Sequence, residues 1–275
     1  MDFVKMHGLG NDFIFIEDKE GAEKDYTELA ARLCDRHTGI GADGLIVTVP
    51  SDKADVCMRI INADGSEAEM CGNGIRCFAK FVYEQGIISA EEFTVETLGG
   101  IMKPTLHVEN GKVKTVTIDM GMPRLDRKDI PMEGPAGEVK KEPFTIDGQT
   151  YLISSMYLGV PHTMVFVDDV TKIDLPVLGR KIETHPAFPN RTNVNFVQQI
   201  DEHTIKVRTW ERGAGATLAC GTGSCASAVA AFLSGMTGRE VDVELYLGTL
   251  RIEYRESDGR VYMTGPAEVV FTGTI

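Results

Sequence analysis

The feature of this sequence that most constrains its fold is a cysteine–glycine motif that occurs once in each half. The chain contains CGNGIRC at residues 71–77 and CGTGSCA at residues 220–226, and the two motifs begin 149 positions apart. The segment after each motif has helical spacing or a helix-favouring composition, and it ends in a glycine, Gly86 or Gly235. Because glycine commonly follows the last turn of a helix, we expect a helix after each cysteine.

The resemblance between the two halves extends beyond the cysteines. Further landmarks recur at the same spacing of 149 residues: Gly10 and Gly159, Asn62 and Glu211, and Gly99 and Gly248. A fixed spacing that links several positions indicates that one structural unit has been duplicated. With only two copies, the sequence predicts two similar domains rather than a solenoid.

Apolar patterns predict the same plan in both halves, with strands before each motif and a helix around residues 27–37. The expected strands lie at 2–8, 12–18, 44–50 and 55–63, and at 151–159, 162–169, 192–199 and 204–213. Each half then ends in a predicted three-stranded meander, at 92–121 and 241–265. We expect one domain at residues 1–120, joined by 266–275 and carrying Cys71, and another at 121–265, carrying Cys220.

Composition and charge argue against several classes of partner. The chain of 275 residues has a formal net charge of −13 and no run of Lys or Arg, which argues against nucleic acid or an anionic membrane. No apolar run approaches the length of a membrane span, and the first residues lack the features of a secretory signal. Six cysteines in such a chain predict reduced thiols and a cytoplasmic location.

The cysteine motifs favour neither metal nor phosphate binding. Their spacings differ from those of structural zinc sites and no His lies nearby, so we expect no metal ligands. The glycines are not followed by Lys and Ser or Thr, as a phosphate-binding loop requires. Four cysteines are predicted to be small buried residues: Cys34, Cys57, Cys77 and Cys225.

Cys71 and Cys220 differ from these four because each precedes glycine at the start of a predicted helix. The helix dipole and the free N–H groups of the first turn favour a thiolate there. The backbone amides that can hold a carboxylate are those of Gly72, Asn73, Gly221 and Thr222. Two mirrored sulfurs, one charged and one neutral, suit the inversion of a stereocentre, because one removes the α-proton and the other returns a proton to the opposite face. The helix N-termini would stabilise the charge that develops on the carboxylate.

Five segments together resemble the diaminopimelate epimerase family: HGLGNDF, NADGSEAEMCGNGIRCFAKF, GVPHTMVFVDD, RTNVNFVQ and WERGAGATLACGTGSCASA. The resemblance is collinear and covers essentially the whole chain. It implies an isomerase that needs no pyridoxal phosphate or other cofactor and interconverts LL- and meso-2,6-diaminopimelate for lysine and peptidoglycan synthesis. It also implies an α/β (α+β) fold of two domains related by a pseudo-twofold axis, each a mixed, mostly antiparallel sheet wrapped around a central helix.

The same resemblance implies roles for individual residues. Cys71 and Cys220 would be the acid/base pair, and His162 and Glu211 would tune the two thiols. Asn11 would meet the substrate amine at the reacting centre. The carboxylate there would be held by Gly72, Asn73, Gly221 and Thr222, and the distal amino-acid end would be bound by Asn62, Asn193, Glu211 and Arg212.

Two positions depart from the family pattern. Val160 stands where the family usually has Asn, and Ala216 stands where it often has Glu. They motivate a second hypothesis, a cofactor-independent racemase or epimerase of another amino acid, such as lanthionine or histidine. A third hypothesis is a redox role in which Cys71 and Cys220 form a regulatory disulfide. The expected partner is a small amino-acid substrate, and the sequence leaves the oligomeric state open, with a homodimer as one option.

Overall fold

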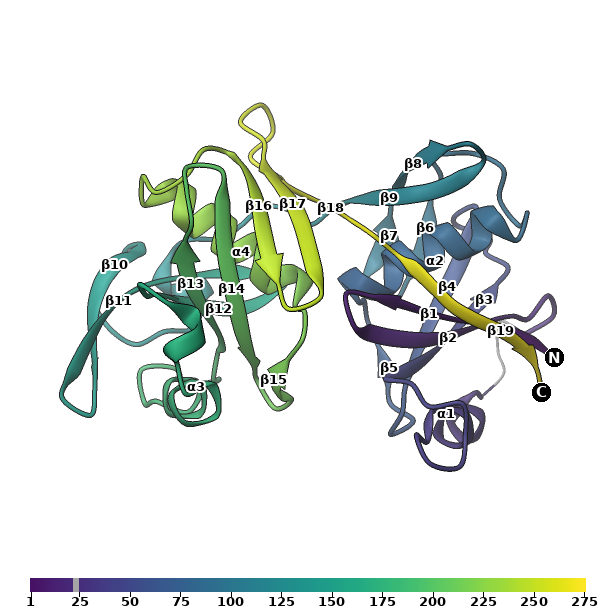
Figure 1. Ribbon diagram of the computed structural model, residues 1–275, viewed down its shortest axis with the longest axis horizontal. Helices are drawn as coiled ribbons and strands as arrows, with labels where there is room; N and C mark the ends of the chain where they lie inside the picture. Colours follow the sequence, from purple (N-terminus) through teal and green to yellow (C-terminus); the bar gives the residue numbers. More distant parts are fainter. Residues whose placement is uncertain (22–24) are drawn as a thin grey trace. The chain divides into compact units, whose positions relative to one another are not determined.

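The computed structural model describes residues 1–21 and 25–275, which form two compact units (Figure 1). The N-terminal unit consists of Met1–Asp119 and Thr264–Ile275, and the C-terminal unit of Met120–Met263. Each unit carries one cysteine–glycine motif. In the part of the chain that the structure describes, no helix is long and apolar enough to cross a membrane.

The N-terminal unit is built on a mixed sheet with the strand order β19-β1-β2-β3-β4-β6-β7, and β5 also pairs with β4. β2 and β3 run parallel, as do β4 and β6, whereas the other neighbours are antiparallel. β8 and β9 form an antiparallel hairpin. The strands are β1 (Asp2–Gly8), β2 (Asn11–Glu17), β3 (Gly44–Val49), β4 (Val56–Asn62), β5 (Glu67–Ala68), β6 (Val95–Thr97), β7 (Gly100–Met102), β8 (Thr105–Glu109), β9 (Lys112–Asp119) and β19 (Glu268–Thr274).

Helix α2 (Gly72–Glu84) is the central helix of this unit, and α1 (Thr27–Cys34) packs against β3 and β4. α2 contacts β1 to β4 as well as β9, so strands flank it on several sides. Ile75, Phe78 and Val82 on α2 are fully buried, as their helical spacing predicts. Burial of each such side chain contributes about 1.5–3 kcal/mol, which holds the start of α2 in place.

The C-terminal unit repeats this plan. Its strands follow the order β10-β11-β12-β13-β14-β16-β17-β18, and β15 also pairs with β14. β12 and β13 are parallel, and so are β14 and β16, which reproduces the two parallel pairs of the first unit. The strands are β10 (Val139–Ile146), β11 (Gln149–Leu158), β12 (Val160–Phe166), β13 (Asn193–Gln199), β14 (Thr204–Glu211), β15 (Gly215–Thr217), β16 (Glu240–Leu245), β17 (Gly248–Tyr254) and β18 (Val261–Gly265).

Helix α4 (Gly221–Leu233) is the central helix of the second unit and contacts β11 to β14, β16 and β17. Its side chains are mostly small and buried, which lets strands approach it closely on several sides. α2 and α4 end alike, because Gly86 and Gly235 follow them with left-handed φ angles of 72° and 71°. The predicted class, a mixed sheet and a central helix in each half, is confirmed, whereas the pseudo-twofold axis stays a prediction.

The prediction of a three-stranded meander at 92–121 is wrong. This segment forms four strands, because β7 ends at Met102 and β8 begins at Thr105. Pro104 lies between them and has no backbone N–H for a sheet ladder, so the strand expected there is divided. The second meander has the three expected strands, β16 to β18.

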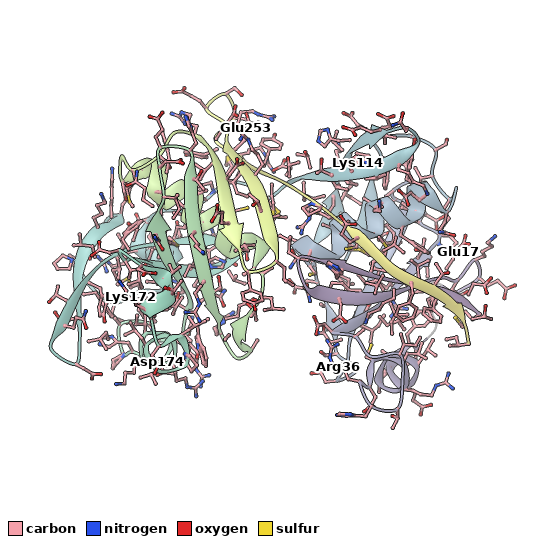
Figure 2. All side chains as sticks on the ribbon, in the orientation of Figure 1. Glu17, Arg36, Lys114, Lys172, Asp174 and Glu253 are labelled. Carbon is pink, nitrogen blue, oxygen red and sulfur yellow. The ribbon has the colours of Figure 1, made fainter. Side chains whose placement is uncertain are left out.

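Helix α3 (Leu175–Glu183) was not predicted. Asp174, labelled in Figure 2, is its N-cap residue and accepts a hydrogen bond from the backbone N–H of Val177. Pro176 lies in the first turn, where the missing N–H costs little. This Asp-x-Pro sequence is a start signal, but the helix that follows is only 9 residues long.

Candidate active site

Cys71 is the N-cap residue of α2 and has the extended backbone typical of that position. Its Sγ accepts a hydrogen bond from the backbone N–H of Gly74, with 3.3 Å between S and N. A β-carbon on Gly74 would lie 3.3 Å from the Cβ of Cys71, so glycine at this position lets the helix start close to the sulfur. Cys71 as a whole is half-buried.

Two asparagines adjoin Cys71. The thiol of Cys71 donates to Oδ1 of Asn11, with 3.4 Å between the two atoms. Nδ2 of Asn73 donates to the same oxygen at 3.3 Å. The structure therefore brings together Asn11, Cys71 and Asn73, which are three of the residues expected in the site.

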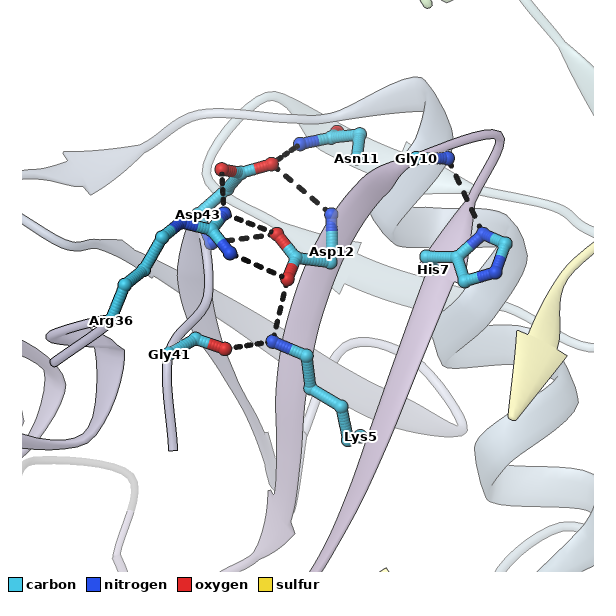
Figure 3. Close-up of polar contacts among 8 residues, drawn as sticks. All are labelled: Lys5, His7, Gly10, Asn11, Asp12, Arg36, Gly41 and Asp43. Atoms are coloured by element: carbon cyan, nitrogen blue, oxygen red, sulfur yellow. Dashed lines mark hydrogen bonds and ion pairs between the residues drawn. The ribbon is translucent and has the colours of Figure 1, made fainter. Parts of the chain in front are cut away.

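A cluster of four charged side chains lies next to Asn11 (Figure 3). Asp43 accepts from Nδ2 of Asn11 at 2.7 Å, and Arg36 joins Asp43 to Asp12. Lys5 also pairs with Asp12 at 2.7 Å and donates to the carbonyl of Gly41. Burial would raise the pKa of Asp12, but the hydrogen bonds and charges of Arg36 and Lys5 outweigh it and lower the pKa to about 2.

Asn62 ends β4, and Gly44, which begins β3, is its register partner. Asn11 begins β2, and β2 runs parallel to β3. Asn62 therefore lies at the same end of the sheet as Asn11. Its Nδ2 donates to Ser66 Oγ at 3.0 Å.

Cys220 is the N-cap residue of α4, at the position that corresponds to Cys71. Only 5% of its surface is exposed. Its Sγ lies 3.6 Å from the hydroxyl oxygen of Thr222. Burial raises the pKa of the Cys220 thiol far above its ordinary value, and the negative charge of Glu211 raises it further. The two cysteines therefore share a place in the fold but differ in their surroundings.

Glu211 ends β14 and interacts with the Cys220 thiol. Its Oε1 accepts a hydrogen bond from Thr217 Oγ1 at 2.6 Å. Burial raises the pKa of Glu211, and the hydrogen bonds from Thr217 and Cys220 partly offset this effect. A carboxyl group with a raised pKa beside a thiol can moderate the charge of the sulfur.

His162 lies on β12 and is fully buried. Burial, with a smaller contribution from the positive charge of Arg212, lowers its pKa to about 3. Its Nδ1 is 3.2 Å from Nδ2 of Asn195, whose Oδ1 accepts from Thr209 at 3.0 Å. Because an amide nitrogen only donates, Nδ1 of the neutral ring accepts and Nε2 carries the proton. Among the described residues, Nε2 has no hydrogen-bond partner.

Asn193 and Arg212 are joined by a hydrogen bond from the backbone N–H of Arg212 to Oδ1 of Asn193, at 2.7 Å. The guanidinium of Arg212 donates to the carbonyl of Asn190 at 2.9 Å. No ion pair with a carboxylate of the described residues holds it. Gly221 and Thr222 are the first two residues of α4. The C-terminal unit thus gathers His162, Asn193, Glu211, Arg212, Cys220 and Thr222 around the start of one helix.

Glu183, at the end of α3, supports this region and was not predicted. It is fully buried and accepts from Nε1 of Trp210 at 2.8 Å and from the backbone N–H of Gly213 at 3.3 Å. Burial would raise the pKa of Glu183, but these hydrogen bonds and the charge of Arg180 outweigh it and lower the pKa. Glu183 therefore anchors the residues on both sides of Glu211 and Arg212.

The two positions that depart from the family pattern lie in different surroundings. Val160 is a half-buried residue at the start of β12 and follows Gly159, where a β-carbon would lie 3.8 Å from the methyl group of Thr222. Ala216 is exposed on β15, opposite Trp210. In the described ranges, no group of three or more His, Cys, Asp or Glu side chains is placed to hold a metal ion.

Comparisons with known proteins identify similar sequences and similar folds. Residues 3–125 and 154–270 match the family model described as diaminopimelate epimerase. The diaminopimelate epimerase of Pelotomaculum thermopropionicum is 54% identical over 276 aligned residues, which cover 99% of this chain and 98% of that protein.

Two solved structures share the fold at low sequence identity. A Bacillus anthracis protein of the phenazine biosynthesis PhzF family has a TM-score of 0.72 and 16% identity. The alignment covers 100% of this chain and 98% of that protein's chain. A probable proline racemase from Agrobacterium radiobacter has a TM-score of 0.67 and 17% identity. The alignment covers 100% of this chain and 92% of that protein's chain.

Proposed function

Because the chain belongs to the diaminopimelate epimerase family, we propose that its two helix-capping cysteines are the acid and the base of one epimerisation. The chain is an isomerase that epimerises diaminopimelate. The observation that carries the mechanism is the repeated placement of Cys71 and Cys220, each the N-cap residue of the buried central helix of its unit.

In the proposed reaction, a thiolate takes the α-proton and the C–H electron pair moves onto the α-carboxylate. The thiol of the other cysteine then gives its proton to the opposite face, so that one S–H bond forms and another breaks. Both sulfurs exchange protonation state, and the reverse reaction starts from the new state. The N–H groups at the helix starts stabilise the negative charge on the carboxylate.

We assign the resting proton to Cys220. Its thiol is almost fully buried and lies beside Glu211, and both features oppose a thiolate. Cys71 is half-buried, and a backbone N–H points at its sulfur, which stabilises negative charge there. When the substrate ammonium takes over Oδ1 of Asn11, the Cys71 thiol loses this acceptor, releases its proton to solvent and becomes the first base.

The remaining expected residues are proposed to bind the substrate. Asn11 accepts a hydrogen bond from the substrate ammonium, and the guanidinium of Arg212 holds the distal carboxylate through its planar fork of donors. His162 and Glu211 tune the thiols. The carboxylate at the reacting centre is assigned to the amides of Gly72, Asn73, Gly221 and Thr222, and the distal end also to Asn62, Asn193 and Glu211.

The proposal needs no pyridoxal phosphate, because the sulfurs and the helix starts supply the proton transfer and the charge stabilisation. Diaminopimelate is a precursor of lysine and peptidoglycan in the pathway that the family resemblance implies. We therefore place the enzyme in the cytoplasm, where cysteine thiols stay reduced.

We propose that the chain forms a homodimer through β19. Figure 1 shows β19 beside β1, and β19 ends the sheet order in the part of the chain that the structure describes. Val269, Val270 and Phe271 on this strand are exposed by 44%, 53% and 45%. A second copy would cover this apolar strand and pair its free edge.

A different amino-acid substrate, suggested by Val160 and Ala216, is not favoured. The identity to a diaminopimelate epimerase is 54% over 99% of this chain and 98% of that protein. Val160 is accordingly a tolerated variation at the edge of the binding region.

The test is proton NMR of the reduced enzyme in D₂O with LL-diaminopimelate, meso-lanthionine, L-histidine or L-lysine in separate samples and no added cofactor. We expect loss of the α-proton signal with diaminopimelate at a rate far above that of the other three. Faster exchange with another amino acid would contradict the substrate assignment, and a lack of exchange in every sample would contradict the mechanism.

A further inference from the structure

Four side chains in the N-terminal unit form a continuous relay of hydrogen bonds next to Cys71. Nη2 of Arg76 donates to Oδ1 of Asn73 at 2.9 Å. Nδ2 of Asn73 donates to Oδ1 of Asn11 at 3.3 Å, and Nδ2 of Asn11 donates to Oδ2 of Asp43 at 2.7 Å. Two amides therefore lie in series between a guanidinium and a carboxylate.

The charged ends set the direction of both amides. A guanidinium only donates hydrogen bonds and an ionised carboxylate only accepts them, whereas an amide has one end of each kind. The Oδ1 atom of Asn73 must therefore face Arg76, and the Nδ2 atom of Asn11 must face Asp43. Either amide turned alone would place two donors or two acceptors against each other. The two ends specify the same direction, so the relay has one satisfied arrangement.

Both ends of the relay are themselves held. Arg76 is fully buried, and its Nη1 and Nε donate to the carbonyls of Gly72 and Pro266 at 3.0 and 3.3 Å. Asp43 accepts from Arg36 at 2.7 Å and from the backbone N–H of Asp12 at 3.1 Å, as Figure 3 shows. The relay is therefore anchored to α2 at one end and to the loop before β3 at the other.

The direction of the relay decides what Asn11 offers to the site. Its Oδ1 faces the sulfur of Cys71 at 3.4 Å, so the side chain is an acceptor for the thiol. We propose that Asp43 and Arg76 are positioning residues that keep this oxygen, rather than the NH₂ group, toward Cys71 and the substrate. The part of this inference that concerns the substrate rests on the proposed function, because an ammonium group needs an acceptor.

The test replaces Asp43 by Ala and measures alkylation of Cys71 by iodoacetamide as a function of pH, with mass spectrometry of the peptide that contains Cys71. Without Asp43, the direction of the Asn11 amide depends on the single 3.3 Å hydrogen bond from Asn73, so the amide can turn its NH₂ group to the sulfur and stabilise the thiolate. We expect the midpoint of the alkylation profile to move down by about one pH unit. An unchanged midpoint in the folded variant would overturn the relay.

Asp12→Asn is the matched control. It removes one negative charge from the same cluster and loosens Arg36 and Lys5, but the Asp12 side chain makes no hydrogen bond to Asn11, which donates to Asp43 instead. We expect its alkylation midpoint to stay close to that of the wild type. An equal shift in both variants would show that charge alone is responsible and would also overturn the proposal. The milder Asp43→Asn, which keeps the side-chain volume, should give an intermediate shift.

A second measurement uses substrate. Asp43→Ala should raise KM for diaminopimelate about tenfold, the loss typical of a charge-assisted hydrogen bond, and Asp12→Asn should raise it less. Alkylation requires no substrate, so the two proposals fail separately. A wild-type enzyme that does not epimerise diaminopimelate contradicts the proposed function, whereas an unshifted Cys71 profile contradicts the relay.

Discussion

Glu211 and Cys220 control each other's protonation, and this coupling can be measured. Burial and the charge of Glu211 both raise the pKa of the Cys220 thiol. Glu211→Gln removes the charge and keeps the volume, so the pKa of Cys220 should fall. We expect the alkylation profile of the Cys220 peptide to move to lower pH. A profile that stays in place, or moves to higher pH, would show that burial alone sets the state of this thiol.

His162 should make the stability of the chain depend on pH. Its pKa is about 3 in the folded chain against 6.5 in its ordinary state, so the unfolded chain binds the extra proton between these values. The stability it contributes is complete above pH 6.5 and is lost as the pH falls toward 3, at about 1.4 kcal/mol per pH unit. Urea unfolding of the wild type and of His162→Gln at pH 7.5 and 5.0 tests this sign. The wild type should lose about 2 kcal/mol more than the variant. Equal losses would mean that the ring titrates alike in both states.

The supporting residues of the site were the part that the sequence did not reveal. Asn11, Cys71 and Cys220 stand in motifs that recur or are recognisable. Asp43 and Glu183 are single carboxylates in segments without a distinctive pattern, and their partners lie 32 and 27 positions away. The supporting role of such residues can be recognised only from the folded structure, in which distant segments lie next to each other.

At the scale of elements, the two central helices depend on close packing at their starts. A β-carbon on Gly223 would overlap Oδ1 of Asn195 and lie 3.2 Å from the sulfur of Cys220. Gly223→Ala should therefore cost about 1–3 kcal/mol of stability and reduce epimerisation, because Cys220 or Asn195 must shift. Gly238→Ala is the control, since a β-carbon at Gly238 meets nothing within 4 Å. Urea unfolding measures the stability of both variants, and α-proton exchange measures their epimerisation. Equal stability and equal exchange rates in the two variants would show that Gly223 is not needed for close packing at the start of α4.

The sequence predicted the elements that combine strong periodicity with clear end signals. The helices after Cys71 and Cys220 begin and end where the capping cysteine and the following glycine indicate. α3 was not predicted because it is short, and β7 and β8 were expected as one strand because the apolar pattern continues through Pro104. At α3 and at Pro104, backbone hydrogen bonding rather than the pattern of apolar side chains determines where the helix and the strands begin and end.

At the scale of the whole molecule, the apolar edge strand β19 predicts association. Phe271 is 45% exposed and packs edge-on against Phe3, with ring centroids 5.9 Å apart. Phe271→Glu would place a charge in the proposed interface and should convert a dimer into a monomer. Sedimentation velocity of the wild type and the variant measures this. A monomeric wild type would contradict the proposed homodimer.

The most direct test of the two-cysteine mechanism is the isotope content of the product at early conversion in D₂O. LL-diaminopimelate is incubated with the enzyme, the reaction is stopped after a few per cent, and the separated meso product and remaining substrate are analysed by mass spectrometry. With two sulfurs, the product takes its α-hydrogen from a thiol that has exchanged with the solvent. We therefore predict that almost every product molecule carries one deuterium while the remaining substrate carries almost none. A product that retains the substrate's own α-hydrogen would show that one base serves both faces, which would contradict the account.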